Sequence, residues 1–314
     1  MTSEFRTAPG SLFPVVVDNT MRETLNRCQK AAYWAYERGL RPVGPTSIDL
    51  HAGLAFAKGL EKARSFYFDK GENAAYAIRL GVEACTEAYG DYVPPETKYP
   101  SAKTGPRMAG AVCAYFDKHP LNAEEPVWKR REARTAIEQP FSFHTGLRHP
   151  VTGFPLHYAG RYDYMHVRDG AVWGVENKTG KEFDAAWCNQ WVLNSQITGY
   201  CWVGPKLLEK HNIDLPFGGV EIHGTGITTK GYNHIVLSFK REQWEIDRWF
   251  EQMTQDFAMW AIAHEDSRHS MALGHGCAQY GRPCDFAKLC SVPDPELLVE
   301  GNFVINRWNP LDDH

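Results

Sequence analysis

The sequence predicts an α/β protein in which helical and strand segments alternate along the chain. Amphipathic segments with helical periodicity fill most of residues 19–118 and return at residues 184–204 and 242–265. Apolar segments rich in β-branched and aromatic residues are typical of strands, and they occur at residues 134–143, 158–164, 172–178, 218–229 and 232–240.

Length and composition set limits on the class of protein. With 314 residues, 43% of them hydrophobic, the chain can bury a large core as one domain or as a domain with an appendage. No run of 18 apolar residues occurs, so no membrane span is expected. The N-terminus lacks a basic start followed by a long apolar core, so we expect a cytoplasmic protein. Its eight cysteines are then metal ligands or reduced core thiols.

Two helices are expected near the N-terminus, after an extended segment over residues 1–18. The first covers residues 19–39, and Cys28 falls on its apolar face as either a buried thiol or a ligand. The second covers residues 46–68 and carries His51 on a small, apolar stretch. A lone histidine there is more often a core residue than a ligand.

The next segments lead into the sheet. Two more helices, residues 73–90 and about 103–118, show no pattern that indicates chemistry. The strand over residues 134–143 follows, with Glu138 between Ile137 and Gln139. It begins a sheet that the following strands continue.

The central feature is a predicted hairpin over residues 160–178. Asp169-Gly170 lies between two strand-like segments, which is a strong hairpin signal. Because strand side chains alternate, Glu176 and Lys178 share one face while Asn177 points away, and the hairpin brings Asp163 beside them. Two carboxylates with one ammonium form a site for a divalent cation and an anionic substrate, which is phosphodiesterase chemistry. The alternative is a solvated rim of charged residues.

A helix follows the hairpin, beginning after Asp184 and ending at Gly204-Pro205. Within it, Gln196 and Tyr200 are four residues apart and therefore lie on one face. Both can hydrogen-bond a phosphate or orient a water molecule, or they can be an ordinary half-buried pair.

The C-terminal region concentrates cysteines in one loop. Cys277, Cys284 and Cys290 fall within fourteen residues interrupted by glycine and proline, and such thiols in a cytosolic protein most often hold a metal. The fourth ligand is either His275, which gives a zinc site, or the remote thiol of Cys28.

The combined pattern resembles the PD-(D/E)XK nuclease superfamily, in its RecB-like exonuclease branch. The residues that carry the resemblance occur in the family's order: His51, Asp163, Glu176-Asn177-Lys178 and Gln196-x-x-x-Tyr200. The cysteines are similar to those of members with an iron–sulfur cluster, including CRISPR-associated and phage exonucleases. The resemblance covers roughly residues 20–291. Two features depart from the pattern, since Cys277-x6-Cys284 replaces the usual C-x2-C and no proline precedes Asp163.

The resemblance implies a restriction-endonuclease-like core, with a mixed central β-sheet flanked by helices and an N-/C-terminal helical part tethered by the cluster. His51, Asp163 and Glu176 would bind Mg²⁺ or Mn²⁺, with the Asn177 carbonyl as a further ligand. Lys178 would orient the attacking water. Gln196 and Tyr200 would help to hold the DNA backbone and the catalytic lysine, and Glu138 would be an accessory acid. Four thiols would bind a [4Fe–4S] cluster: Cys28, Cys277, Cys284 and Cys290.

The domain organisation follows from the same resemblance. Residues 1–18 are an extended segment, residues 19–291 a single nuclease domain, and residues 292–314 a tail. The nuclease domain comprises a helical part (19–125), a catalytic sheet core (130–240) and a C-terminal helix with the cysteine loop (241–291).

The implied activity is that of a metal-dependent DNA exonuclease, working in phage or bacterial DNA recombination or repair in the bacterial cytoplasm. No G-x-x-x-x-G-K-[ST] motif occurs, so a helicase or recombinase would be a separate partner of the DNA-bound protein. The alternative is a catalytically silent, nucleic-acid-binding recombination accessory protein with structural zinc or an iron–sulfur site.

Overall fold

The computed structural model describes residues 13–44, 46–93, 101–129, 132–149, 153–279 and 282–312. The chain forms two compact units. Unit 1 comprises Met1–Gly44, Pro140–Gly160 and Asp247–Asp313. Unit 2 comprises Pro45–Gln139 and Arg161–Ile246. Within the described residues, no helix is long and apolar enough to cross a membrane.

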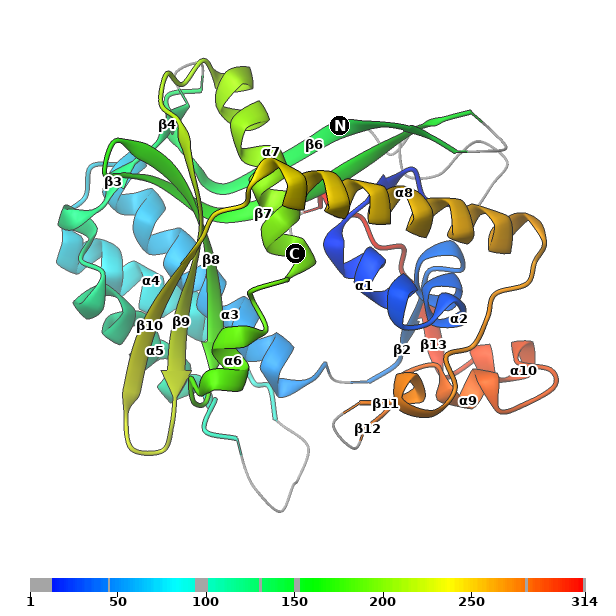
Figure 1. The fold of residues 1–314 in the computed structure, drawn as a ribbon. Coiled ribbons are helices and arrows are strands. Elements are labelled where there is room, and N and C mark those ends of the chain that lie inside the picture. Colours follow the sequence, from blue (N-terminus) through cyan, green and yellow to red (C-terminus); the bar gives the residue numbers. More distant parts are fainter. Residues whose placement is uncertain are drawn as a thin grey trace. The chain divides into compact units, whose positions relative to one another are not determined.

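A mixed β-sheet is the centre of the fold (Figure 1). Its described strands run in the order β1 (Val16–Val17), β7 (Pro155–Arg168), β8 (Ala171–Gly180), β9 (Phe217–Ile227) and β10 (Tyr232–Phe239), and β3 (Glu125–Pro126) and β6 (Ile137–Arg148) also pair with β7. The β1–β7 and β8–β9 pairs are parallel, and the β7–β8 and β9–β10 pairs are antiparallel. The predicted α/β class with a mixed sheet is therefore confirmed.

The β7–β8 hairpin forms where the sequence predicted it. Asp169 and Gly170 both have positive φ angles, 53° and 72°, which a two-residue hairpin turn requires and which the Asp-Gly pair adopts readily. The pairing of the two strands runs from the turn to Tyr164 opposite Val175. Asp163 and Glu176 are the next residues along their strands, so the turn sets these two carboxylates side by side.

Three helices that the sequence predicted pack together in unit 2: α3 (Ile48–Arg64), α4 (Ala74–Tyr89) and α5 (Gly105–Lys118). Ser47 and Asn73 cap the first two, since each side chain accepts a hydrogen bond from a backbone N–H of the first turn. The helices α3 and α4 approach closely at Gly59 and Gly81, because a Cβ on Gly81 would lie 2.6 Å from the Gly59 carbonyl oxygen. α5 contacts β9, so this layer rests on the sheet.

The helix predicted from Asp184 to Gly204 is wrong in its extent. The structure has a short α6 (Ala185–Asn189) and a separate α7 (Ser195–His211). Asn194 begins α7 by accepting a hydrogen bond from the Ile197 N–H, and Pro205 lies inside this helix. α7 ends at Asn212, whose left-handed backbone stops the helix.

Unit 1 contains the first and the last helices of the described chain. Its N-terminal part has α1 (Asn19–Arg27), α2 (Gln29–Ala32), a π-helical turn η2 (Tyr33–Glu37) and β2 (Leu40–Pro42). The continuous helix predicted over residues 19–39 is therefore wrong, because Cys28 has an extended backbone that separates α1 from α2. The C-terminal part has α8 (Gln243–Glu265), η5 (Gly274–Cys277), β11 (Ala278–Gln279), β12 (Arg282–Pro283), α9 (Ala287–Cys290), α10 (Glu296–Val299) and β13 (Phe303–Ile305).

Short elements complete the described chain: η3 (Ser65–Asp69), η4 (Leu121–Ala123), β4 (Trp128–Lys129) and β5 (Arg134–Thr135).

In unit 1, the buried carboxylate of Glu37 accepts a hydrogen bond from the Trp260 indole at 2.6 Å and pairs with His264 and His269. Glu37 thereby joins η2 to α8 and to the segment that precedes the cysteine loop.

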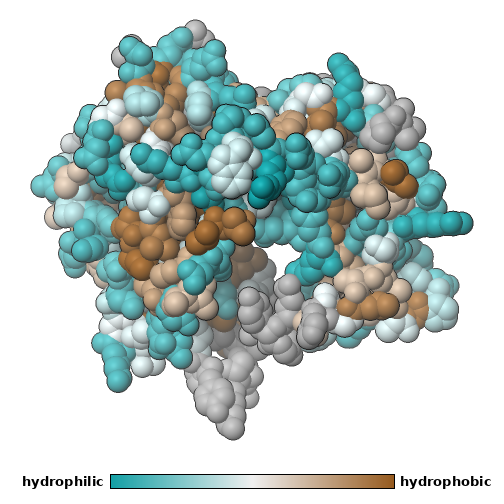
Figure 2. Space-filling view, viewed as in Figure 1, coloured by the Kyte–Doolittle hydropathy of each residue, from teal (hydrophilic) through white to brown (hydrophobic). Residues whose placement is uncertain are grey.

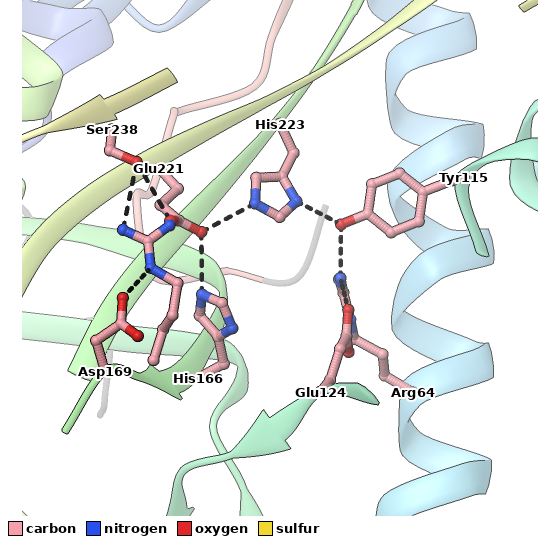
Figure 3. Close-up of polar contacts among 9 residues, drawn as sticks. Arg64, Tyr115, Glu124, His166, Asp169, Glu221, His223 and Ser238 are labelled. Carbon is pink, nitrogen blue, oxygen red and sulfur yellow. Dashed lines mark hydrogen bonds and ion pairs between the residues drawn. The ribbon is translucent and has the colours of Figure 1, made fainter. Parts of the chain in front are cut away.

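A buried polar network in unit 2 joins the helical layer to the sheet (Figure 3). Glu221 Oε2 lies 3.0 Å from His166 Nε2 and 3.1 Å from His223 Nε2, and Arg168 pairs with the other carboxylate oxygen. His223 Nδ1 lies 2.8 Å from the Tyr115 hydroxyl. Burial lowers the pKa of His166 to about 4 and that of His223 to about 3, so both imidazoles are neutral at pH 7.

The network ends at a buried ion pair. Arg64 donates to Tyr115 at 2.7 Å and to both oxygens of Glu124, at 3.1 Å and 3.0 Å. Its guanidinium also lies 4.2 Å from the centroid of the Tyr164 ring. We expect Glu124→Gln to lower the free energy of unfolding by about 3 kcal/mol, because it leaves a buried guanidinium without its anion.

Urea denaturation checks this prediction, with Glu125→Gln as the matched control. Glu125 is exposed, so its substitution should change the free energy of unfolding by less than about 0.5 kcal/mol. Equal effects of the two substitutions would show that the Arg64–Glu124 pair contributes nothing specific.

Candidate active site

Asp163 is half-buried at the point where the paired part of the hairpin ends. Its Oδ2 accepts hydrogen bonds from the backbone N–H of Asn177 at 2.7 Å and from the Asn177 amide at 3.1 Å. Asn177, predicted to point away from Glu176 and Lys178, thus uses its side chain to orient Asp163. Burial and the neighbouring Glu176 raise the pKa of Asp163 to about 7.

Glu176 is 6% exposed and uses its two carboxylate oxygens differently. Oε1 accepts hydrogen bonds from Lys178 Nζ at 2.5 Å and from Gln196 Nε2 at 3.1 Å. Oε2 is buried and has no hydrogen-bond partner among the described residues. An ionised oxygen in such a place is costly unless a cation or a donor compensates it.

Gln196 and Tyr200 lie on one face of α7, as their spacing predicted, and this face meets the site. Gln196 Nε2 lies 3.0 Å from the Tyr200 hydroxyl, which donates to the Arg161 carbonyl oxygen at 2.6 Å. The Tyr162 hydroxyl donates to the Tyr200 carbonyl oxygen at 2.5 Å. These bonds hold α7 against β7 and fix the amide that binds Glu176.

Glu138 also belongs to this cluster. Its positive φ of 44° interrupts the regular start of β6, and its carboxylate lies 3.6 Å from Arg161. Burial, and then the charge of Asp163, raise the pKa of Glu138 to about 8. The sequence offered Glu138 only as an accessory acid, and it contained no signal for Arg161, which compensates part of this negative charge.

His51 has other neighbours in the structure. Its Nε2 lies 2.8 Å from the Tyr89 carbonyl oxygen, and its ring stacks on Tyr92 with 4.0 Å between centroids. Its predicted role as a metal ligand stays a prediction.

The carboxylates fit a hard divalent cation. The described part of the chain places no three His, Cys, Asp or Glu side chains so that they could hold one metal ion. Mg²⁺, however, is commonly bound through one or two carboxylates while it keeps several waters. Asp163 and Glu176 supply such oxygens, and the unpartnered Glu176 Oε2 together with the raised pKa of Asp163 indicates missing positive charge.

The repulsion between the Asp163 and Glu176 carboxylates predicts that stability depends on pH. The pKa of Asp163 in the folded protein, about 7, lies above its ordinary value of 3.8. Between these two pH values the folded state therefore binds more protons than the unfolded state. Metal-free protein should therefore lose stability as the pH rises through this window. We expect Asp163→Asn to raise stability in EDTA at pH 8 by about 2 kcal/mol.

Thermal melts at pH 5 and pH 8, with EDTA and with Mn²⁺, check this. Asp163→Asn should flatten the pH dependence and remove any stabilisation by Mn²⁺. Asp169→Asn, at an exposed position in the hairpin turn, is the control and should melt as the wild type does. A destabilised Asp163→Asn protein in EDTA at pH 8 would contradict the repulsion between the carboxylates.

The four predicted cluster cysteines lie around one cavity in unit 1. Cys28, Cys277, Cys284 and Cys290 line a space of about 220 Å³ together with apolar side chains that include Phe286. The break between α1 and α2 turns Cys28 toward this space, where its Sγ accepts a hydrogen bond from the Ala272 N–H at 3.4 Å. Burial raises the pKa of Cys284 and of Cys290. The side chain of His275, the alternative ligand, lies outside the described residues.

Comparisons with known proteins give distant likenesses. No protein-family model matches the chain, and no curated protein matches it. Among solved structures, the chain is similar to the "Putative exonuclease" of Eubacterium rectale, with 8% identity, a TM-score of 0.48 and coverage of 93% of this chain and 98% of that one. It is also similar to SSO0001, with 12% identity, a TM-score of 0.27 and coverage of 76% and 83%. At these scores neither likeness identifies a family or an activity.

Proposed function

We propose that this protein is a divalent-metal-dependent DNA exonuclease that hydrolyses phosphodiester bonds. The observation that carries the proposal is the contact group of Glu176, Lys178 and Gln196, with the Asp163 carboxylate within electrostatic reach of Glu176, at the end of the β7–β8 pairing. It combines one buried and one half-buried carboxylate with an ammonium group that is half-buried and reachable by a substrate. A purely structural ion pair needs one carboxylate for one ammonium, and here the second carboxylate raises the energy of the folded state.

Each side chain has a role in phosphodiester hydrolysis. Asp163, Glu176 and the Asn177 carbonyl would hold Mg²⁺ or Mn²⁺, with His51 as a further candidate ligand; when bound, the ion supplies Lewis-acid chemistry and a more acidic water. Lys178 holds the attacking water and stabilises the negative charge that develops on the phosphate oxygens.

The α7 residues support these roles. Gln196 keeps Glu176 oriented through its 3.1 Å hydrogen bond, and Tyr200 keeps Gln196 in place. Because Gln196 and Lys178 share Glu176 Oε1, a shift of either changes the electrostatic environment of the other.

We further propose that Cys28, Cys277, Cys284 and Cys290 hold a [4Fe–4S] cluster with a structural role. The four thiols line one cavity, and cysteine thiolates are the ligands that iron–sulfur clusters take. The apolar lining would protect such a cluster from solvent.

Digestion of end-labelled DNA tests the proposed activity. Linear and closed circular DNA, each single- and double-stranded, are incubated with Mg²⁺ or Mn²⁺, with EDTA as the control. We expect metal-dependent loss of linear DNA only. Cleavage of closed circles would indicate an endonuclease, and absence of cleavage from folded, DNA-binding protein would favour a catalytically silent binding protein.

A further inference from the structure

Two aliphatic side chains stand out from the surface next to the candidate active site. Leu193 is 89% exposed and Val192 is 50% exposed, and both lie in the turn between α6 and α7. Figure 2 shows apolar residues gathered on this face of unit 2, over the region where Figure 1 draws β8, β9 and the chain between α6 and α7. Apolar residues grouped on an exposed face, as here, are a common feature of surfaces that contact another molecule.

The turn that carries them is held by a buried arginine. The Arg241 side chain donates to the Val192 carbonyl at 2.7 Å, to the Trp191 carbonyl at 3.3 Å and to the Thr198 hydroxyl at 3.0 Å. The guanidinium therefore ties both sides of the turn to the end of β10. The exposed side chains of Val192 and Leu193 are therefore carried by a backbone that hydrogen bonds hold in place.

The segment before the turn is anchored on the sheet by aromatic rings. Phe183 and Trp187 pack 4.4 Å apart, and Trp187 contacts Trp191 at 5.5 Å between centroids. Gly180 in β8 and Gly224 in β9 make room for these rings: a Cβ on Gly224 would lie 2.8 Å from Trp187, and one on Gly180 would lie 3.0 Å from Phe183. α6 is thus fixed at the end of the strand that carries Glu176 and Lys178.

The exposed pair lies between two residues that reach the active-site side chains. Trp191 has its ring centroid 5.8 Å from Lys178 Nζ, and Gln196 is bonded to Glu176. Leu193 is two residues from the first and three from the second, which limits the distances between Cα atoms to about 7 Å and about 11 Å. The pair therefore lies on a short turn whose flanking residues on both sides contact the active-site side chains.

We propose that Val192 and Leu193 form a wedge that inserts against the bases of a duplex DNA end and unstacks the base pair next to the scissile phosphate. This inference rests on the proposed function. The pair has no charge or hydrogen-bonding group for the sugar–phosphate backbone, so bases are the part of the substrate that it can contact. Apolar wedges that part base steps are an established way for proteins to open a duplex locally.

A wedge at this position implies that the substrate is duplex DNA with a free end. Opening the terminal pair frees one strand to reach Lys178 without an ATP-driven motor, and the chain contains no nucleotide-binding motif for such a motor. Single-stranded DNA has no pair to open, so its cleavage does not need the wedge.

A double variant, Val192→Ser with Leu193→Ser, tests the proposal against the control Val236→Ser. Val236 is an exposed aliphatic residue of β10 in the same unit. A duplex with 2-aminopurine at the second position from its end reports unstacking as a rise in fluorescence, with Ca²⁺ present to limit cleavage. We expect the rise with wild type and with the control, and no rise with the double variant at equal DNA occupancy.

Cleavage rates provide the second readout. For the double variant, the ratio of the cleavage rate on blunt duplex to the rate on the same sequence as a single strand should fall about tenfold. A tenfold fall in rate corresponds to only part of the free energy that unstacking a base step costs. A wild-type protein that binds duplex ends without a fluorescence rise would overturn the wedge. An unchanged duplex-to-single-strand ratio in the double variant would also overturn it. Failure of the proposed function would differ, because no DNA of any form would then be cleaved by wild type.

Discussion

Lys178→Ala leaves the protein folded and lowers the rate of DNA cleavage by at least about 10²-fold, the cost of removing one charge-stabilising donor from an active site. The reason is geometric. Lys178 Nζ lies 2.5 Å from Glu176 Oε1 and is the ammonium group of the contact group, so its loss removes the positive charge facing a bound phosphate. The side chain is about one third exposed, so its removal leaves no large internal cavity.

Steady-state cleavage of linear DNA in Mn²⁺ and circular dichroism melts measure the two parts of this prediction. Lys181→Ala is the matched control, because Lys181 is an exposed lysine three residues further along the chain and should keep full activity. Lys178→Arg keeps the positive charge but places it on a planar guanidinium group. Its cleavage rate should therefore lie between those of the wild type and Lys178→Ala. Full activity in Lys178→Ala would reject the active-site assignment.

Cys284→Ala gives a colourless protein that unfolds at much lower denaturant concentration. A cluster held by Cys28 and three C-terminal thiols closes a loop of about 250 residues, so its loss frees the unfolded chain and exposes the cavity. We expect a loss of at least about 4 kcal/mol, the order of magnitude for a cross-link across a loop of this length.

Visible absorbance, iron analysis and urea denaturation check this second prediction. Cys113→Ala is the control, because Cys113 is an exposed cysteine of α5 and should keep both colour and stability. His275→Ala, with metal analysis, separates the two ligand sets: a cluster with four thiolate ligands keeps its colour and iron in this variant, whereas a site completed by His275 is a colourless zinc site that loses its zinc. A brown, stable Cys284→Ala protein would contradict cluster ligation by this thiol.

The local parts of the candidate site follow from the sequence alone. Asp169-Gly170 determines the hairpin turn, and the period of two then sets Glu176 and Lys178 together beside Asp163. The spacing of Gln196 and Tyr200 determines that they share one helix face. These predictions succeed because turn type and side-chain periodicity depend on neighbouring residues only.

Only the tertiary structure decided where distant residues meet and where elements break. Glu138 and Arg161 join Asp163 through strand packing, and Arg241 reaches the turn after α6 from the end of β10. The helix break at Cys28 likewise coincides with contacts to a segment more than 240 residues away. Such contacts come from the fit of whole surfaces and from the burial of charged groups among particular neighbours, and no local periodicity encodes either of them.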